Sequence, residues 1–235
     1  MVMLPQPPPD TPAPPPSEAA LRSRRFGRSV LIAGVFVIVG VCCLRGYDDR
    51  RRTRGHDPWE RPFKSVRSLG LTLFEFENEF GKTPDVTTIA AVKERGTSIP
   101  LGTKTSNDFL RQLIAAGFEQ NERLFLTPSR GGRESDNRVD GTHALEKGEC
   151  GFSYLIGPSF SSGTPQPILV TPLITGTDRF DPTLFDGLAI ILWTDNSVKK
   201  LPIDKHGHVM HLGKHLLDPS NPVWLGRPPM ITWPE

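Results

Sequence analysis

Four histidines close together near the C-terminal end are the most visible candidates for chemistry in the sequence. Imidazoles that converge in space bind Zn²⁺ or Ni²⁺ well. Two glycines interrupt the stretch, however, and a hairpin would place His208 and His211 on opposite faces. There is no nearby cysteine and no H-E-x-x-H spacing. We therefore expect solvated turn histidines and assign no metal ligand among His206, His208, His211 and His215.

Three aspartates cluster in the segment TGTDRFDPTLFDG: Asp178, Asp181 and Asp186. Carboxylate oxygens on a loop are suitable ligands for Ca²⁺. Their spacing is not that of an EF-hand loop, Arg179 supplies a local counter-charge, and Asp-Pro commonly begins a turn. We expect a solvated turn here, and Ca²⁺ binding near Asp178 and Asp181 stays an open question.

Cys150 stands apart from the other two cysteines of the chain, Cys42 and Cys43. A nucleophilic cysteine needs a base, and the nearest histidine in the sequence is His143. No known catalytic signature surrounds the pair. Because Cys150 directly precedes a predicted strand, we expect it to be a small buried apolar residue. We therefore assign no catalytic and no cofactor-binding residue.

Composition narrows the class of protein without naming a function. The chain has 235 residues, and 28 Lys and Arg against 26 Asp and Glu give a net charge of +2. This near balance argues against a strongly basic nucleic-acid binder. Three cysteines among 235 residues, with 24 prolines and 22 glycines, also exclude a disulfide mini-protein, collagen and a coiled coil. The length suits one domain with appendages.

The N-terminal quarter predicts an anchored protein. Residues 1–28 are rich in proline and then in arginine, which predicts a disordered arm. The uncharged run VLIAGVFVIVGVCCL follows at residues 30–44, and at 1.5 Å per residue it spans roughly 22 Å. Its flanking arginines can extend it towards the bilayer surfaces. We predict a transmembrane helix at 29–46 and a basic linker at 47–59.

Charge around this run bears on its orientation. The positive-inside rule counts Lys and Arg on each side of a span, and the C-terminal side is the richer. Taken alone, this count favours a cytoplasmic domain. The basic linker is most simply a stretch that faces lipid headgroups.

The domain that follows, residues 60–235, is predicted to begin with a long amphipathic helix. Apolar residues repeat at 3-4-3-4 spacing over about 61–80 and so lie on one face. Leu71 and Phe74 form a second apolar patch on this helix. Gly81 and Pro84 end it. Glu75, Glu77 and Glu79 are predicted to form a solvated face, and the buried stripe is predicted to be Val66, Leu69, Leu73, Phe76 and Phe80.

Two shorter helices and a polar loop are predicted next. Asp85 and Gly96 bound a helix at about 86–95, and Thr105 or Ser106 caps another at 107–116. The stretch 128–149 is rich in glycine and polar residues, so we expect an exposed loop there, with a short helix near Ala144.

The second half of the domain changes to a strand pattern. Branched and aromatic residues predict strands at 151–156, 168–174, 188–193, 197–201 and 209–212. Asp195-Asn196 is a hairpin signal, and the proline-rich tail is unsuited to a central strand. Trp224 and Trp233 should fix this tail to the body. Helices followed by antiparallel strands predict an α+β domain.

Several blocks of this domain resemble type IV pilins and pseudopilins. They are SLGLTLFEFENEFGKTPD, ALEKGECGFSYLIG, TPLITGTDRFDP, LWTDNSVKKLPIDKHGHV and LLDPSNPVW, in this order over about residues 60–235. The turn DNSV at 195–198 is similar to the DGSV turn of prepilin-like proteins. The resemblance implies a long helix packed on an antiparallel sheet behind a membrane helix. Some pseudopilins also hold Ca²⁺ in a C-terminal loop.

The N-terminus departs from the pilin pattern. A prepilin cleavage site has Gly followed by an aromatic residue or Met, with Glu at position five of the mature chain. Here Arg28 follows Gly27, and position five is Ile32. The resemblance still implies a domain on the periplasmic side of a bacterial inner membrane, opposite to the arginine count.

Together these observations predict a single-pass, pilin-like structural or interaction protein that is not an enzyme. Its expected partners are the lipid bilayer and proteins of a type II secretion or type IV pilus-like envelope system, with no nucleic acid or small-molecule substrate. The alternative is a metal- or Cys-dependent envelope enzyme that uses the region His206–His215 or Cys150.

Overall fold

The computed structural model describes residues 60–127 and 133–235. Contacts divide the chain into units Met1–His56 and Asp57–Glu235, and only the second is described below. The predicted arm at 1–28, transmembrane helix at 29–46 and linker at 47–59 lie outside the described residues. Within the described ranges, no helix is both long enough and apolar enough to cross a membrane.

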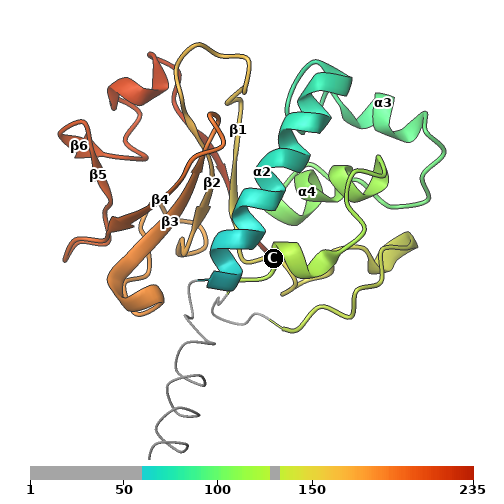
Figure 1. The fold of residues 1–235 in the computed structure, drawn as a ribbon, viewed down its shortest axis with the longest axis horizontal. Coiled ribbons are helices and arrows are strands. Elements are labelled where there is room, and N and C mark those ends of the chain that lie inside the picture. Colours follow the sequence, from blue (N-terminus) through green and yellow to red (C-terminus); the bar gives the residue numbers. More distant parts are fainter. Residues whose placement is uncertain (1–59, 128–132) are drawn as a thin grey trace, which may run out of the picture. The chain divides into compact units, whose positions relative to one another are not determined.

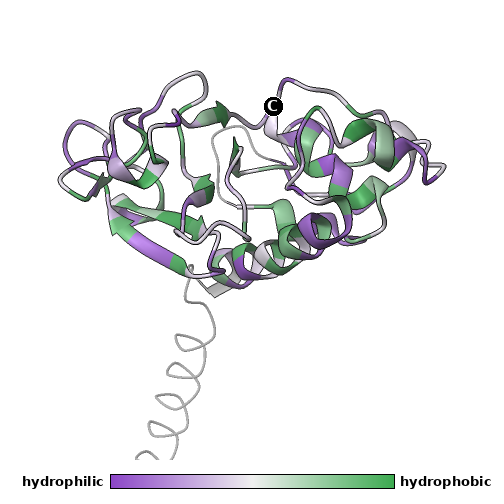
Figure 2. Ribbon diagram, turned by 90° about the horizontal axis from the view of Figure 1, so that it is seen from above, coloured by the Kyte–Doolittle hydropathy of each residue, from purple (hydrophilic) through white to green (hydrophobic). Residues whose placement is uncertain are grey.

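The first element is the long helix that the sequence predicts. Helix α2 covers Glu60–Phe80, and Gly81 ends it with a φ of 77°. Four of the five residues of the predicted stripe are buried, and Phe80 is partly buried. Leu71 and Phe74 are exposed by 52% and 44% of their surface. The helix therefore has one face in the core and a second apolar patch in solvent, and it is banded in hydropathy in Figure 2.

A glycine lets α2 approach the sheet closely. Gly70 lies in the middle of the helix against Leu192 and Asn196. A Cβ atom at this position would collide with Oδ1 of Asn196 and press on the Leu192 side chain, so a larger residue requires these side chains to move. Glycine inside a helix is less favourable than alanine by about 0.5–1 kcal/mol. The close packing of α2 on the sheet offsets this cost.

The sheet is antiparallel throughout, which with the helices makes the domain α+β as predicted. The strands are β1 Ser153–Ile156, β2 Pro167–Thr171, β3 Leu188–Trp193, β4 Val198–Pro202 and β7 Met230–Thr232. They lie side by side in the order β4-β3-β2-β1-β7. The hairpin predicted at Asp195-Asn196 joins β3 to β4.

Both faces of the central strands are covered. Ile190 and Leu192 of β3 belong to a core shared with α2 and with helix α4 (Ser106–Ala115), whereas Ile191 and Trp193 belong to a second core. The second core is completed by the C-terminal segment that carries the small hairpin of β5 (Met210–His211) and β6 (Lys214–His215). Figure 1 shows the sheet between the helices and this hairpin.

The second predicted helix is shorter than expected. Helix α3 covers only Ile89–Lys93. Asp85 does accept backbone hydrogen bonds, but from Thr87 and Thr88 in the turn that precedes the helix. The predicted start at Val86 is therefore wrong because the Asp85 carboxylate stabilises a turn there instead.

The third helix agrees with the prediction. Helix α4 covers Ser106–Ala115, and Thr105 caps it in a reciprocal capping box with Asp108. Ser106 also donates to the backbone oxygen of Thr232, which joins the helix to the C-terminal tail.

The C-terminal part differs from the prediction in its strands. The stretch 209–212 does not join the main sheet, because β5 pairs only with β6 and Val209 forms an isolated bridge with Ile203. The prolines keep β7 at the edge of the sheet. Both tryptophans hold the tail as predicted: Trp224 donates to the Leu216 oxygen and Trp233 to the Thr177 oxygen.

Two leucines on α2 give a matched test of this packing. Leu73 is fully buried and Leu71 is 52% exposed on the same helix. We expect Leu73→Ala to lower the free energy of unfolding by about 2–5 kcal/mol, because it leaves a cavity. Leu71→Ala should change it by less than about 1 kcal/mol. Urea unfolding of both variants checks this, and equal losses would contradict the assigned helix face.

Candidate functional site

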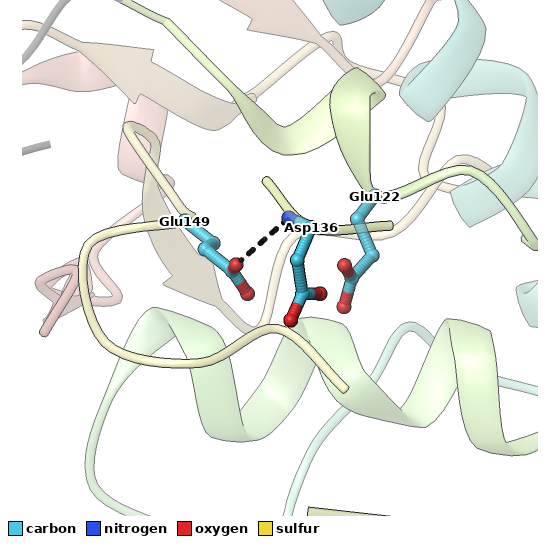
Figure 3. A group of neighbouring side chains, drawn as sticks. All are labelled: Glu122, Asp136 and Glu149. Atoms are coloured by element: carbon cyan, nitrogen blue, oxygen red, sulfur yellow. Dashed lines mark hydrogen bonds between the residues drawn. The ribbon is translucent and has the colours of Figure 1, made fainter. Parts of the chain in front are cut away.

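Three acidic side chains from separate segments meet at one point beside the helices. In residues 60–127 and 133–235 this is the one group of three or more His, Cys, Asp or Glu whose ligand atoms all lie within 4.8 Å of one another. Figure 3 shows the side chains of Glu122, Asp136 and Glu149 side by side. Glu122 begins the short 3-10 helix η1 (Glu122–Phe125), Asp136 lies in a loop, and Glu149 precedes β1.

Two of these carboxylates are buried and hydrogen-bonded. Glu122 accepts from the backbone N–H of Leu145 at 2.5 Å and from the Ser135 hydroxyl at 3.0 Å. Glu149 accepts from the backbone N–H of Glu146 at 2.7 Å and from that of Asp136 at 3.3 Å. Asp136 itself is exposed. The two buried carboxylates thus close the polar loop onto the body of the domain.

One arginine provides the local positive charge. The Arg133 guanidinium contacts Glu149 at 3.0 Å and also pairs with Glu146. Glu146 in turn bonds to His143 at 3.0 Å, and Arg133 and His143 together lower its pKa. The pKa of Glu122 is raised, first by its burial and further by the charges of Glu149 and Asp136, against the opposing hydrogen bonds.

Oxygen atoms in this arrangement suit a hard cation. Ca²⁺ and Mg²⁺ are bound in proteins by carboxylate oxygens at short range. Glu122, Asp136 and Glu149 could each offer one oxygen to such an ion. Every oxygen of the two buried carboxylates already accepts a hydrogen bond, so the group has a structural task in any case.

This acidic group has no counterpart among the residues predicted from the sequence. The sequence predicts an exposed loop over 128–149 with a short helix near Ala144. The 3-10 helix η2 (Gly141–His143) lies there, but the predicted exposure is wrong for the C-terminal part, where Ala144, Leu145 and Glu149 are buried. Glu122 is buried as well. A glutamate that is buried by segments distant in sequence carries no local pattern, so the sequence offers no signal for it.

The four histidines are only partly the solvated residues that were predicted. His206 is exposed, but His215 is buried and its ring lies 4.2 Å from the ring of His208, centroid to centroid. His211 lies instead against Trp193 at 4.8 Å. The described histidines are therefore not gathered into one group of three ligands.

The three aspartates of the predicted turn play separate parts. Asp181 is buried and accepts hydrogen bonds from the backbone N–H and hydroxyl of Thr183, as a turn-forming aspartate does. Asp178 lies 3.9 Å from Nδ1 of His215. Asp186 adopts a positive φ of 52° in the 3-10 helix η3 (Phe185–Gly187). They form no three-ligand group in the described ranges.

Cys150 is placed as a core residue. It is 2% exposed, and burial raises the pKa of its thiol to about 12. Its sulfur lies 3.5 Å from the Phe152 oxygen, whereas His143 is bonded to Glu146. A thiol with this pKa is almost entirely protonated at neutral pH, and the thiolate is the nucleophilic form.

One glutamate of α2 contradicts the predicted solvated face. Glu77 is buried because its carboxylate accepts hydrogen bonds from Ser159, Phe160 and Ser161 in the loop between β1 and β2. Burial alone would raise the pKa of Glu77, but these hydrogen bonds outweigh it and lower the pKa. Glu75 and Glu79 are exposed as predicted.

Comparison with known proteins finds no match for this chain. No family model matches the sequence. No curated protein matches it. No solved structure matches the fold. The function is therefore argued from the chain's own residues.

Replacement of Glu122 tests the acidic group. Because the folded pKa of Glu122 is raised, its ionisation costs stability as pH rises through its ordinary value of 4.5. Glu122→Gln keeps an oxygen for Leu145 and removes the repulsion. We expect it to be at least as stable as the wild type at pH 7, with an advantage that grows as pH rises from about 4 to 7.

Glu149→Gln is the matched control. It places an amide NH₂ among N–H donors and removes the Arg133 pair, so we expect a loss of about 1–3 kcal/mol at pH 7. Chemical denaturation across this pH range measures both variants. A Glu122→Gln variant that is destabilised equally at every pH would contradict the assignment.

Labelling of Cys150 tests whether it is a nucleophile. We expect iodoacetamide at pH 8 to leave Cys150 unmodified in the folded protein and to modify it fully in urea, because the thiol is both buried and protonated. Mass spectrometry of the peptide that contains Cys150 separates it from the other cysteines. Rapid labelling in the folded state would support the enzymatic alternative.

Proposed function

We propose that this chain is a single-pass membrane protein whose pilin-like domain has a structural or interaction role and is not an enzyme. Its partners are the lipid bilayer and proteins of a type II secretion or type IV pilus-like envelope system. In this proposal the domain lies on the periplasmic side of a bacterial inner membrane. The uncharged run at 30–44 is the anchor.

The two-sided character of α2 is the observation that carries the proposal. One face of the helix is buried against the sheet, whereas Leu71 and Phe74 are exposed on another. These residues are one helical turn apart and so form one continuous apolar patch. The Phe74 ring also packs edge-on against the Phe160 ring, with 5.8 Å between the ring centroids, and this contact orients Phe74. Such a patch is suited to a second apolar surface.

The residues whose side chains could be reactive support the same conclusion. Cys150 is a protonated core thiol, and Glu77 holds a loop. The hydroxyl of Tyr154 donates to the Pro84 oxygen at 2.8 Å in the core, where burial raises its pKa. Each of these groups has a structural partner, which favours a scaffold over a catalyst.

Topology and processing are tested together. The full chain with a C-terminal tag is expressed in a Gram-negative host, and protease is added to intact spheroplasts. We expect a full-length chain whose domain is digested from outside. A protected domain would place it in the cytoplasm and overturn the envelope role, and a product shortened near Gly27 would show prepilin processing.

The apolar patch is tested in the same membranes. A photo-crosslinking amino acid at position 71 or 74 should give a protein adduct, and the same group at the exposed Lys93 on α3 should not. Equal labelling at all three positions would show that α2 presents no specific contact face.

A further inference from the structure

Two imidazoles are stacked where the C-terminal segment closes over the sheet. The rings of His208 and His215 lie 4.2 Å apart between centroids, with 36° between their planes. The ring of His206 lies a further 6.4 Å from that of His208, at the exposed side of the turn. The stacked pair joins the turn after β4 to strand β6.

The inner ring of this stack is poorly placed to carry a charge. His215 is only 9% exposed, and its Nε2 atom is buried without a hydrogen-bond partner among the described residues. A neutral imidazole needs one donor and one acceptor nitrogen, so Nε2 can remain an unprotonated lone pair. An imidazolium would place a charged N–H there with nothing to receive it, which is far more costly.

The charges around His215 come from four segments. His208 faces it from the stack, and Asp178 lies 3.9 Å from its Nδ1 on the loop after β2. Asp204 and Asp218 add weaker attraction from the turns that flank the segment. Burial, together with His208, outweighs the three carboxylates and lowers the pKa of His215.

His211, the second histidine of the hairpin, also has a lowered pKa. His211 lies against the Trp193 ring, whose other neighbour is the Lys199 ammonium, 4.6 Å from the ring centroid. Burial first, and then the Lys199 charge, lower the pKa of His211. The surroundings of both hairpin histidines, His211 and His215, therefore favour the neutral imidazole.

The stack holds a segment that covers the second core, on one face of the sheet. Val209 and Leu216 lie on either side of the hairpin and fill the second core, and the Leu216 N–H donates to the Val209 oxygen at 2.7 Å. The Asn221 side-chain amide also holds the hairpin, because it donates to the backbone oxygens of His211 and His215. If the stack opened, this side of the sheet would lose its cover.

We propose that the stacked pair His208–His215 is a proton-operated latch: protonation separates the rings and releases the hairpin β5–β6 from the sheet. At neutral pH the neutral His215 ring stacks on His208 and the segment is closed. When pH falls and His215 takes up a proton, its charge would be buried at Nε2 without an acceptor, beside the His208 ring at 4.2 Å. The domain would then respond to the acidity of its compartment, in addition to the proposed scaffold role.

The direction of the pH effect follows from linkage. A histidine whose folded pKa is lowered contributes stability that is fully present above its unfolded pKa of 6.5. This contribution is lost as pH falls through 6.5 towards the lower folded value. The window of the latch is therefore mildly acidic, below pH 6.5.

Hydrogen exchange on the full chain in detergent micelles tests the latch. We expect the protection factor of the Leu216 amide to fall by about tenfold or more between pH 7.5 and 5.5, after correction for intrinsic rates. The Ala116 amide, which donates to the Gln112 oxygen in α4, should keep its protection. His215→Gln should remove most of the response and leave the part that His211 contributes, and His208→Gln should weaken it.

His206→Gln is the matched control, because this histidine lies in the same turn but is exposed. It should behave as the wild type. An equal loss of protection at Leu216 and Ala116, or a response of His215→Gln equal to that of the wild type, would overturn the proposal. If His215→Gln does not fold, the proton NMR titration of the wild-type histidines decides. A His215 midpoint at or above 6.5 would also overturn it.

Discussion

The need to cover both faces of strand β3 governs the architecture of this domain. Five of its six residues are buried, and alternate side chains point to opposite faces of the sheet. One face carries Ile190 and Leu192 and the other carries Ile191 and Trp193. A sheet that is apolar on both faces needs a layer on each side, since exposed apolar area costs about 25 cal/mol per Å². Helix α2 supplies one layer, and the C-terminal hairpin segment supplies the other.

The two layers differ in how they are held, and this difference bears on their roles. The helical layer is fastened by close apolar packing at Gly70 and by the Glu77 carboxylate, which binds the loop at Ser159. The hairpin layer also has apolar packing, through Val209, Leu216 and Trp224, but its two-stranded ladder is held in addition by the Asn221 amide and by ring contacts that histidines make. Imidazoles change charge near neutral pH, whereas apolar packing does not. The helical layer is therefore suited to a permanent scaffold, and the hairpin layer is suited to a response.

Polar burial follows the same logic throughout the domain. Glu122 and Glu149 are buried only because backbone N–H groups, Ser135 and Arg133 satisfy their oxygens. A buried carboxylate without such partners would cost several kcal/mol. The acidic group thus joins the loop to the body of the domain. A cation there would share oxygens that the fold already uses.

Local patterns in the sequence determined the elements that are repetitive. The 3-4-3-4 stripe predicted α2, Thr105 or Ser106 as a cap predicted the start of α4, and the branched residues of 188–193 predicted β3. Each of these signals comes from periodicity or capping within a few residues, so it needs no knowledge of distant neighbours. The α+β class followed from their order along the chain.

Tertiary contacts alone decided which polar residues are buried. The sequence predicts Glu77 to be one of three solvated glutamates. In the structure, a loop about eighty residues further along the chain surrounds its carboxylate with hydrogen-bond donors. Glu122 and Glu149 are joined through residues 133–146, and His215 is buried by stacking on His208. Whether a polar side chain faces water or the interior depends on partners brought together by folding. No local spacing records those partners, so the acidic group and the histidine stack became visible only in the folded chain.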